Sequence, residues 1–137
     1  MGVDGVIIPD LIPEEAGELL RASEEVGLST VFLLAPTSGI DRIKLVASVS
    51  KGFIYYVSIT GVTGAQLRLD NKISNSINSI RGVTNTPIVI GFGISNPQEA
   101  SIVAQLCDGV VVGSAIVRRI GAGEPIGDFV RFLREVV

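Results

Sequence analysis

The stretch Pro87-Ile88-Val89-Ile90-Gly91-Phe92-Gly93-Ile94-Ser95 shows how this chain is built. A short run of apolar, mainly β-branched residues ends in a glycine turn, and the turn opens onto residues with helical spacing. The same order recurs where Gly113-Ser114-Ala115 follows the apolar residues 109–112, with Gly113 placed 20 positions after Gly93. A buried strand, a tight turn and a helix in succession predict βα units, in which the strands are parallel.

The two glycine turns also suit a bound phosphate. The anion needs several backbone N–H groups pointed at it, and glycine lets the backbone come close because it carries no side chain. In barrels of alternating strands and helices, the loops after the last two strands and the N-terminus of a short extra helix often supply these donors. Ser114 is placed to begin such a helix. A tight connection that simply requires glycine explains either turn alone equally well, but the two turns in this order favour an anion site.

Strands and helices are expected to alternate along the whole chain. The apolar runs predict strands over residues 3–8, 30–35, 53–58, 87–91 and 109–112. Helical spacing follows each of them, and Ser38 with Asp41 and Asn96 with Glu99 are placed as capping pairs at two helix starts. No linker or low-complexity segment interrupts the pattern, so residues 1–137 are predicted to form a single α/β domain.

Charge and residue usage argue against several classes of function. The net charge is −3 and the basic residues are scattered, which is unfavourable for nucleic-acid binding. The chain has no histidine and one cysteine, so we expect no metal site and no Ser-His or Cys-His nucleophile. Cys107 continues the apolar spacing of a helix and is predicted to pack in the core.

The apolar composition points to buried strands. Hydrophobic residues make up 47% of the chain and charged residues 18%, a balance typical of strands covered on both faces. The apolar runs are much shorter than the roughly 18 residues that a membrane helix needs, so no membrane association is expected. A single cysteine forms no internal disulfide and suits a reducing compartment, which makes the cytoplasm, or a plastid stroma, the expected location.

The predicted sheet is too small to be a closed barrel. An eight-stranded barrel takes about 250 residues. The sheet would keep open edges at residues 3–8 and 109–112 and a bare inner face, which favours aggregation. The chain is therefore either an open flavodoxin-like sheet or part of something larger.

Several segments resemble the alpha subunit of tryptophan synthase. The most specific pair is Thr60-Gly61-Val62-Thr63-Gly64 followed by Gly91-Phe92-Gly93-Ile94-Ser95. The resemblance extends over the whole chain, in order and spacing, through Gly2-Val3-Asp4-Gly5-Val6-Ile7-Ile8-Pro9-Asp10-Leu11, Phe53-Ile54-Tyr55-Tyr56-Val57-Ser58 and Val112-Gly113-Ser114-Ala115. That family is a (βα)₈ barrel of nearly twice this length, and the match begins at its fourth strand. The resemblance thus implies a partial TIM barrel made of strands four to eight.

The resemblance also implies an activity. The family is a lyase of tryptophan biosynthesis that cleaves indole-3-glycerol phosphate to indole and glyceraldehyde 3-phosphate. It uses a glutamate and an aspartate that lie before the region of resemblance, so no residue of this chain takes those catalytic roles. Indole then passes to a β subunit that carries pyridoxal phosphate. A β partner is therefore implied, while this chain itself is expected to hold no cofactor.

By resemblance, this chain supplies the binding half of the site. Gly64, Gly93, Gly113 and Ser114 are expected to contact the phosphate, and Thr63 resembles a lid threonine that helps to close the site.

Four further residues resemble members of the indole pocket or its surroundings. Ile7, Leu33 and Phe92 resemble pocket-lining residues, and Tyr55 resembles the tyrosine beside the catalytic carboxylates. Without the resemblance, Ile7 and Leu33 would be interpreted as core residues. Asp10 follows the first predicted strand, where the family keeps an aspartate implicated in communication with the β subunit.

One departure and two further acids complete this interpretation. Many family members carry arginine where this chain has Ile59, so an ion pair that closes the lid is in doubt. Asp4 and Asp108 precede strands and are expected to be structural, because the N-terminal ends of barrel strands form the stability face.

Two alternative functions stay open on the sequence. The chain could be a non-catalytic, phosphate-binding half-barrel that associates with itself through its open edges. It could also belong to another phosphate-handling barrel, such as an isomerase of histidine or tryptophan biosynthesis, although those enzymes lack the Thr60-Gly61-Val62-Thr63-Gly64 segment.

Overall fold

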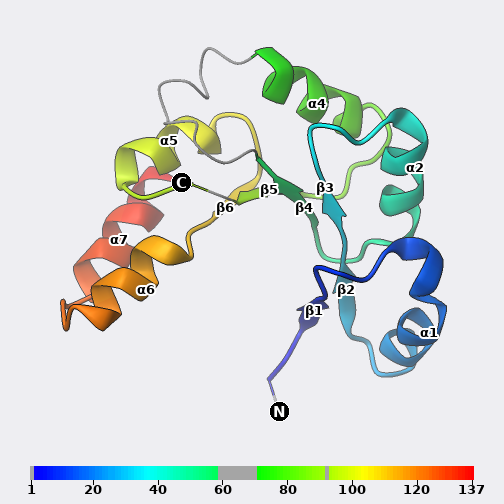
Figure 1. The fold of residues 1–137 in the computed structure, drawn as a ribbon, viewed down its shortest axis with the longest axis horizontal. Coiled ribbons are helices and arrows are strands. Elements are labelled where there is room, and N and C mark those ends of the chain that lie inside the picture. Colours follow the sequence, from blue (N-terminus) through cyan, green and yellow to red (C-terminus); the bar gives the residue numbers. More distant parts are fainter. Residues whose placement is uncertain (1, 59–70, 92) are drawn as a thin grey trace.

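The computed structural model describes residues 2–58, 71–91 and 93–137. Strands and helices alternate along the chain, with α1 and α2 at one end of the molecule and α6 and α7 at the other (Figure 1). The elements are β1 (Gly5–Ile7), the 3-10 helix η1 (Pro13–Glu15), α1 (Gly17–Glu25), β2 (Ser29–Val31), β3 (Leu33–Leu34), α2 (Ile40–Val49), β4 (Ile54–Val57), α4 (Asn71–Arg81), β5 (Ile88–Gly91), α5 (Pro97–Ala104), β6 (Gly109–Val111), α6 (Ser114–Gly121) and α7 (Gly127–Val136). Each predicted strand is present, and the one expected over residues 30–35 is interrupted at Phe32 into β2 and β3.

All the strand pairs are parallel and follow the order of the chain. β1 pairs with β2, and β3, β4, β5 and β6 form a second ladder in that order. Only Phe32 separates β2 from β3, so the second ladder continues from the first. A flavodoxin-like sheet places its first strand between the second and third. The observed order therefore excludes that alternative, and it leaves β1 and β6 as the edges that the sequence predicted.

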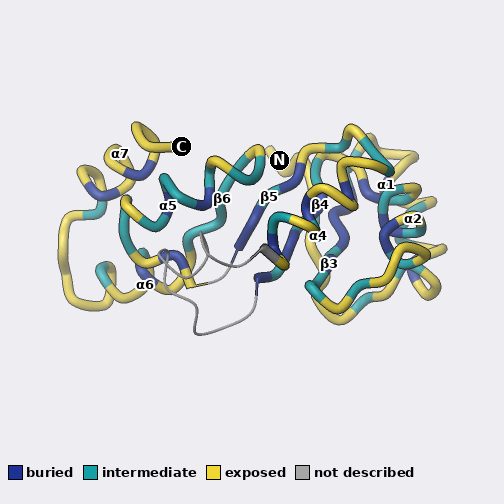
Figure 2. Tube along the Cα trace, turned by 90° about the horizontal axis from the view of Figure 1, so that it is seen from above, coloured by how far each residue is buried: buried dark blue, intermediate teal, exposed yellow. Residues whose placement is uncertain are grey.

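The sheet is covered on one face only. Along β4 and β5, Ile54, Tyr56, Ile88 and Ile90 are fully buried, whereas the alternating residues such as Tyr55 are half-buried. Figure 2 shows this burial concentrated in the strands at the centre of the molecule. The expectation of strands covered on both faces is thus wrong for the described residues. On the second face, the described residues Tyr55, Val57 and Val89 are only half-buried.

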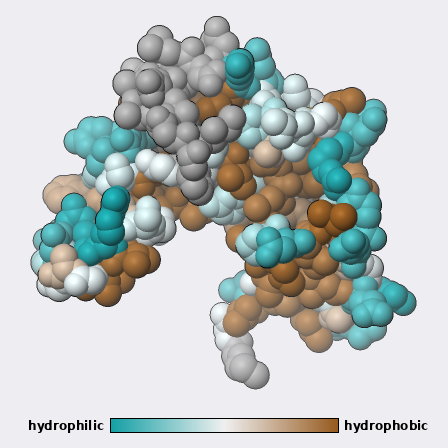
Figure 3. Space-filling view, in the orientation of Figure 1, coloured by the Kyte–Doolittle hydropathy of each residue, from teal (hydrophilic) through white to brown (hydrophobic). Residues whose placement is uncertain are grey.

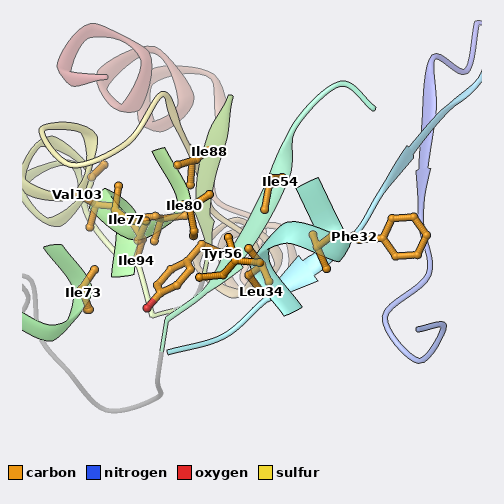
Figure 4. Packing of buried hydrophobic residues seen from close by; sticks show 14 of the residues in the cluster. Phe32, Leu34, Ile54, Tyr56, Ile73, Ile77, Ile80, Ile88, Ile94 and Val103 are labelled. Carbon is orange, nitrogen blue, oxygen red and sulfur yellow. The ribbon is translucent and has the colours of Figure 1, made fainter. Parts of the chain in front are cut away.

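The core lies between the covered face and the helices. Ile73, Ile77 and Ile80 of α4 are buried in one cluster with Leu34 and Tyr56 of the strands (Figure 4). Their spacing of three and four residues is the periodicity by which the sequence predicts this helix. Each buried isoleucine contributes about 1.5–3 kcal/mol relative to an exposed one. None of the helices in the described residues has both the length and the apolar character needed to cross a membrane.

Cys107 packs against this core, as predicted. Its side chain is half-buried, and its Sγ lies 3.3 Å from the carbonyl oxygen of Val103 and 3.0 Å from that of Gly109. Burial raises the pKa of the thiol, which keeps it protonated and unreactive at neutral pH.

Of the two predicted capping pairs, one is confirmed and one is wrong. Asn96 Oδ1 accepts a hydrogen bond from Glu99 N at 2.9 Å, and Glu99 Oε2 accepts from Ser95 N at 2.8 Å. Helix α2 instead begins after Gly39 without a side-chain cap. Ser38 Oγ accepts from Ala35 N at 3.0 Å, so the turn that leaves β3 uses the hydroxyl that the sequence assigned to the helix.

Asp108 closes the N-terminal end of the sheet and has the predicted structural role. Its Oδ2 accepts a hydrogen bond from Ile88 N at 2.8 Å, and Arg81 NH2 lies 3.1 Å from both carboxylate oxygens. The hydrogen bond from Ile88 N, followed by that from Arg81, lowers the pKa of the Asp108 carboxyl. The carboxylate thus ties the start of β5 to α4 and to the start of β6.

We expect Asp108→Asn to destabilise the chain at neutral pH by about 1 kcal/mol, a modest value because solvent screens a side chain that is 41% exposed. The folded-state pKa lies below the unfolded one, so the contribution is complete above the unfolded pKa and disappears as the pH falls through the folded pKa. Denaturant unfolding of both proteins between pH 7 and pH 2 measures the difference. Asp128→Asn removes an exposed ion pair with Arg131 and is the control, which we expect to change stability by no more than about 0.5 kcal/mol. A difference that persists undiminished at acid pH would contradict the role of the ionised carboxylate.

Candidate functional site

The two glycine turns lie at the same end of the sheet, where the strands reach their C-termini. β5 and β6 are parallel neighbours, and Gly91 is the register partner of Val111. Gly93 and Gly113 each come two residues after that pair, so both turns leave from the C-terminal ends of adjacent strands. In sheets of parallel strands, ligands bind at the C-terminal ends of the strands.

Helix α6 begins directly after the second turn. Gly113 O accepts hydrogen bonds from Ile116 N at 3.0 Å and from Val117 N at 3.1 Å. The amides of Ser114 and Ala115 precede these bonds and have no partner within the helix. Gly113 and Ser114 are both exposed, and no side chain caps the helix. Free first-turn amides at a positive helix end are the donors that a phosphate uses.

The structure separates the two explanations for glycine at these turns. Gly93 has φ +73°, a conformation that favours glycine whether or not a ligand binds. Gly113 has φ −108°, and no heavy atom of the described residues lies within 4 Å of the position that its Cβ would take. Neither a positive φ nor a neighbour among the described residues therefore requires glycine at position 113. Close approach of a ligand to the backbone stays the predicted reason for glycine there.

Three of the predicted pocket residues share the open face of the sheet. Leu33 is the register partner of Tyr55 across β3 and β4, and Ile7 is the partner of Val31 across β1 and β2. Leu33 is half-buried and Ile7 is 41% exposed. Ile7 is thus not a core residue of the described fold, contrary to what its residue type alone suggests.

Tyr55 crosses this open face toward Gly91. A Cβ at Gly91 would overlap the phenol oxygen of Tyr55 and would lie 2.9 Å from its Cε1. The ring therefore passes directly over the glycine at the end of β5, next to the first turn. Burial raises the pKa of the Tyr55 phenol, so its hydroxyl stays protonated at neutral pH and can donate a hydrogen bond.

A mainly apolar cavity of about 400 Å³ adjoins the same face. Leu33, Val57, Pro9, Ile12 and Leu11 are among its lining residues. Figure 3 shows apolar side chains gathered over the strands in the middle of the molecule and down to β1 and β2. An aromatic ring is the kind of group that such a surface can accommodate.

The remaining predicted residues are placed as follows. Asp10 is exposed and lies after β1, at the same edge of the sheet as the turns. Thr63, Gly64 and Phe92 lie outside the described residues. Among residues 2–58, 71–91 and 93–137, no group of three or more His, Cys, Asp or Glu is positioned to hold a metal ion.

Comparison with known proteins assigns the family. The model of the tryptophan synthase alpha chain family matches residues 1–131. This chain belongs to that family. The alpha chain of Geobacter sulfurreducens is 48% identical over 142 residues, which cover 99% of this chain and 54% of that protein. The alpha chain of Geotalea daltonii is 51% identical over 118 residues, or 86% of this chain and 45% of that protein. The alternative of an isomerase from another barrel family is therefore wrong.

Solved structures of similar fold agree with the family assignment. A protein from Aquifex aeolicus superposes with a TM-score of 0.87 at 39% identity, over 99% of this chain and 51% of that one. Tryptophan synthase from M. tuberculosis superposes with a TM-score of 0.73 at 32% identity, over 96% of this chain and 47% of that one. The fold is thus a partial TIM barrel, and the chain spans about half the length of the curated relatives that it matches.

Two features of the site were missed by the sequence. The contact of Tyr55 with Gly91 has no local signal, because the two residues are 36 positions apart along the chain. The second feature is the pair Arg118 and Arg119, which lie on α6 and line one groove with Ala115 of its first turn. The spacing of Arg118 from Ser114, four residues along a helix, is the signal that could have placed it beside the site.

Proposed function

We propose that this chain supplies the phosphate-binding and indole-binding half of a lyase site that cleaves indole-3-glycerol phosphate to indole and glyceraldehyde 3-phosphate. In this proposal its strands correspond to strands four to eight of the family barrel. The catalytic glutamate and aspartate belong to the part that precedes them. The chain alone then binds the substrate's ends but lacks the groups that move protons.

The observation that carries the proposal is the paired position of the two turns. Gly93 and Gly113 follow register partners on adjacent parallel strands, and α6 begins at Ser114. A phosphate at this edge would accept hydrogen bonds from the amides of Ser114 and Ala115 and from the Ser114 hydroxyl. The partial positive charge of the helix N-terminus adds to its binding energy.

The open face of the sheet orients the other end of the substrate in this proposal. Leu33 and Ile7 offer apolar contacts for the indole ring, and the protonated phenol of Tyr55 offers a donor above Gly91. Thr63, Gly64 and Phe92 complete the site by the family pattern. A phosphate held at one end and a ring at the other fix the bond to be cleaved between them, which lowers the entropic part of the barrier.

We further propose a β partner that carries pyridoxal phosphate and receives the indole. The similarity to tryptophan synthase of M. tuberculosis supports a partner of this kind. Asp10, exposed after β1, is the residue through which we expect the two chains to communicate. We propose the cytoplasm, or a plastid stroma, as the location, since the single cysteine is reduced and half-buried.

Ser114→Asp tests the phosphate site. We expect this variant of the 137-residue chain to lose at least about 30-fold in affinity for sn-glycerol 3-phosphate, because like charges about 4–6 Å apart near a protein surface repel by a few kcal/mol. Isothermal titration calorimetry measures the affinity. Ser48→Asp makes the same change at an exposed site on α2 and is expected to leave the affinity within about twofold. Equal affinities for the two variants would refute the proposed site.

A second candidate function is suggested by the exposed apolar residues at the β1 edge. Ile7, Ile8 and Ile12 are 41%, 42% and 44% exposed. A second copy of the chain that covered them would produce a non-catalytic, phosphate-binding dimer. Sedimentation velocity distinguishes the two functions. A stable dimer that binds sn-glycerol 3-phosphate and is unaffected by the rest of the barrel would favour this candidate over the lyase half-site.

A further inference from the structure

A groove of about 320 Å³ runs along one face of α6. Its lining residues are Ser95, Ala115, Arg118, Arg119, Ala122 and Glu124. Ser95 belongs to the connection that follows Gly93, whereas Ala115 belongs to the first turn of α6. The α6 residues of the groove recur at intervals of three and four, which places them on one side of the helix.

The two arginines of the groove have different surroundings. Arg119 NH1 lies 2.7 Å from Glu124 Oε2, and its guanidinium stacks 4.2 Å above the centre of the Phe129 ring. These contacts hold the end of α6 against α7. Arg118 is exposed and has no ion-pair partner among residues 2–58, 71–91 and 93–137. Glu124 is engaged by Arg119, and the Glu99 carboxylate next to the groove accepts hydrogen bonds from Ser95 N and Ser95 Oγ at 2.8 Å. Of the two lining arginines, Arg118 is therefore the one without an ion pair among the described residues.

The charge of Arg118 lies beside the proposed phosphate position. Side chains on a helix lean toward its N-terminus, so Arg118 extends over the turn that begins at Ser114. Arg118 also lines the same groove as Ser95, which follows the other glycine turn. The chain as a whole is acidic, with a net charge of −3, so its overall field repels an anion. A local cation at the entrance to the anion site offsets that repulsion.

We propose that Arg118 is a further recognition residue for the phosphate group, which it attracts through its charge at the rim of the two turns. The inference rests on the proposed function and adds a residue that the glycine pattern does not contain. Because the side chain is exposed, its effect is electrostatic and sensitive to salt. The amides of Ser114 and Ala115 fix the position of the anion, and Arg118 strengthens its binding.

Arg118→Gln in the 137-residue chain tests the inference, with sn-glycerol 3-phosphate as the probe in isothermal titration calorimetry. We expect its Kd to rise about three- to fivefold at 50 mM NaCl, the range typical of an exposed charge pair, and by less than about twofold at 300 mM NaCl. Arg118→Lys keeps the charge and should restore most of the affinity. The control is Arg21→Gln on α1, which makes the same change in net charge at the opposite end of the molecule (Figure 1). It should bind as tightly as the unaltered chain.

The outcomes separate this inference from the proposed function. One outcome is that the unaltered chain binds the probe, that Ser114→Asp weakens binding as expected, and that Arg118→Gln binds like Arg21→Gln. This outcome overturns the inference and leaves the proposed function standing. If Arg118→Gln weakens binding equally at both salt concentrations, or Arg118→Lys does not restore it, the role is not one of charge and the inference is also overturned. If the unaltered chain does not bind the probe, both fall. Thermal unfolding of each variant, expected to be unchanged, shows that the binding differences do not arise from loss of the fold.

Discussion

By itself, the 137-residue chain should cleave indole-3-glycerol phosphate at least about 10⁴-fold more slowly than an intact family member. Each positioned proton-transfer group contributes about 10²–10⁴-fold, and the proposed function places both of them outside this chain. The chain matches 54% of the length of the Geobacter sulfurreducens alpha chain, and we propose that the first three βα units lie in the part of that relative outside the match. A separately produced segment of that relative, carrying the first three units, should restore measurable turnover when mixed with this chain. Indole formation is the measurement.

Two controls isolate the source of the restored activity. A segment in which both catalytic carboxylates are replaced by amides should bind this chain yet restore no turnover. The Ser114→Asp form of this chain, mixed with the unaltered segment, should show a raised KM because it weakens the phosphate site. Turnover by the isolated chain at a rate close to that of the intact relative would contradict the assignment of the catalytic groups to the missing units.

Gly91→Ala should destabilise the sheet. The new Cβ would overlap the phenol of Tyr55 in a rigid strand that pairs on both sides, so either the ring or the backbone must move. Overpacking of this kind costs about 1–3 kcal/mol. We expect a value in the lower half of that range, because the phenol is the far end of a half-buried side chain and can move aside. Urea unfolding monitored by circular dichroism measures the loss in the free energy of unfolding.

A double-mutant cycle and a matched glycine test the stated cause. Tyr55→Leu removes the ring, so its combination with Gly91→Ala should cost at least about 1 kcal/mol less than the sum of the single changes. Gly109→Ala is the matched control in the neighbouring strand, where the new Cβ would meet only Val89 Cγ2 at 3.4 Å. We expect a smaller loss there, below about 1 kcal/mol. Additive losses at Gly91 and Tyr55 would show that the contact is not the reason for glycine.

The capping pairs show how local patterns succeed and fail. Asn96 and Glu99 satisfy amides within the same turn, so spacing alone identifies them correctly. Ser38 has the same residue type and spacing, but its hydroxyl is taken by Ala35 N in the turn that leaves β3. Ala35 and Asp41 both lie three residues from Ser38, and the sequence does not tell which of their backbone amides will reach its hydroxyl.

The sequence likewise predicted some features of the candidate site and missed others. The glycine turns were recognisable because each lies between a β-branched run and a helical pattern, and the family resemblance selected Ile7, Leu33 and Tyr55. The register of the strands brings these residues together in space, because Leu33 pairs with Tyr55 and Gly91 pairs with Val111. Pairing across strands depends on contacts between distant parts of the chain, which periodicity within one segment does not encode.

The amino-acid sequence by itself determined the alternation of strands and helices, the family and the residue types at the two turns, because hydrophobic periodicity and glycine act over a few neighbouring residues. Only the tertiary structure decided which side chains of the sheet the helices cover, that Tyr55 lies over Gly91 and that, among the described residues, Arg119 has an ion-pair partner while Arg118 has none. These properties depend on which side chains from separate elements come within a few ångströms of one another. That is a consequence of packing the elements together, and no single element contains it.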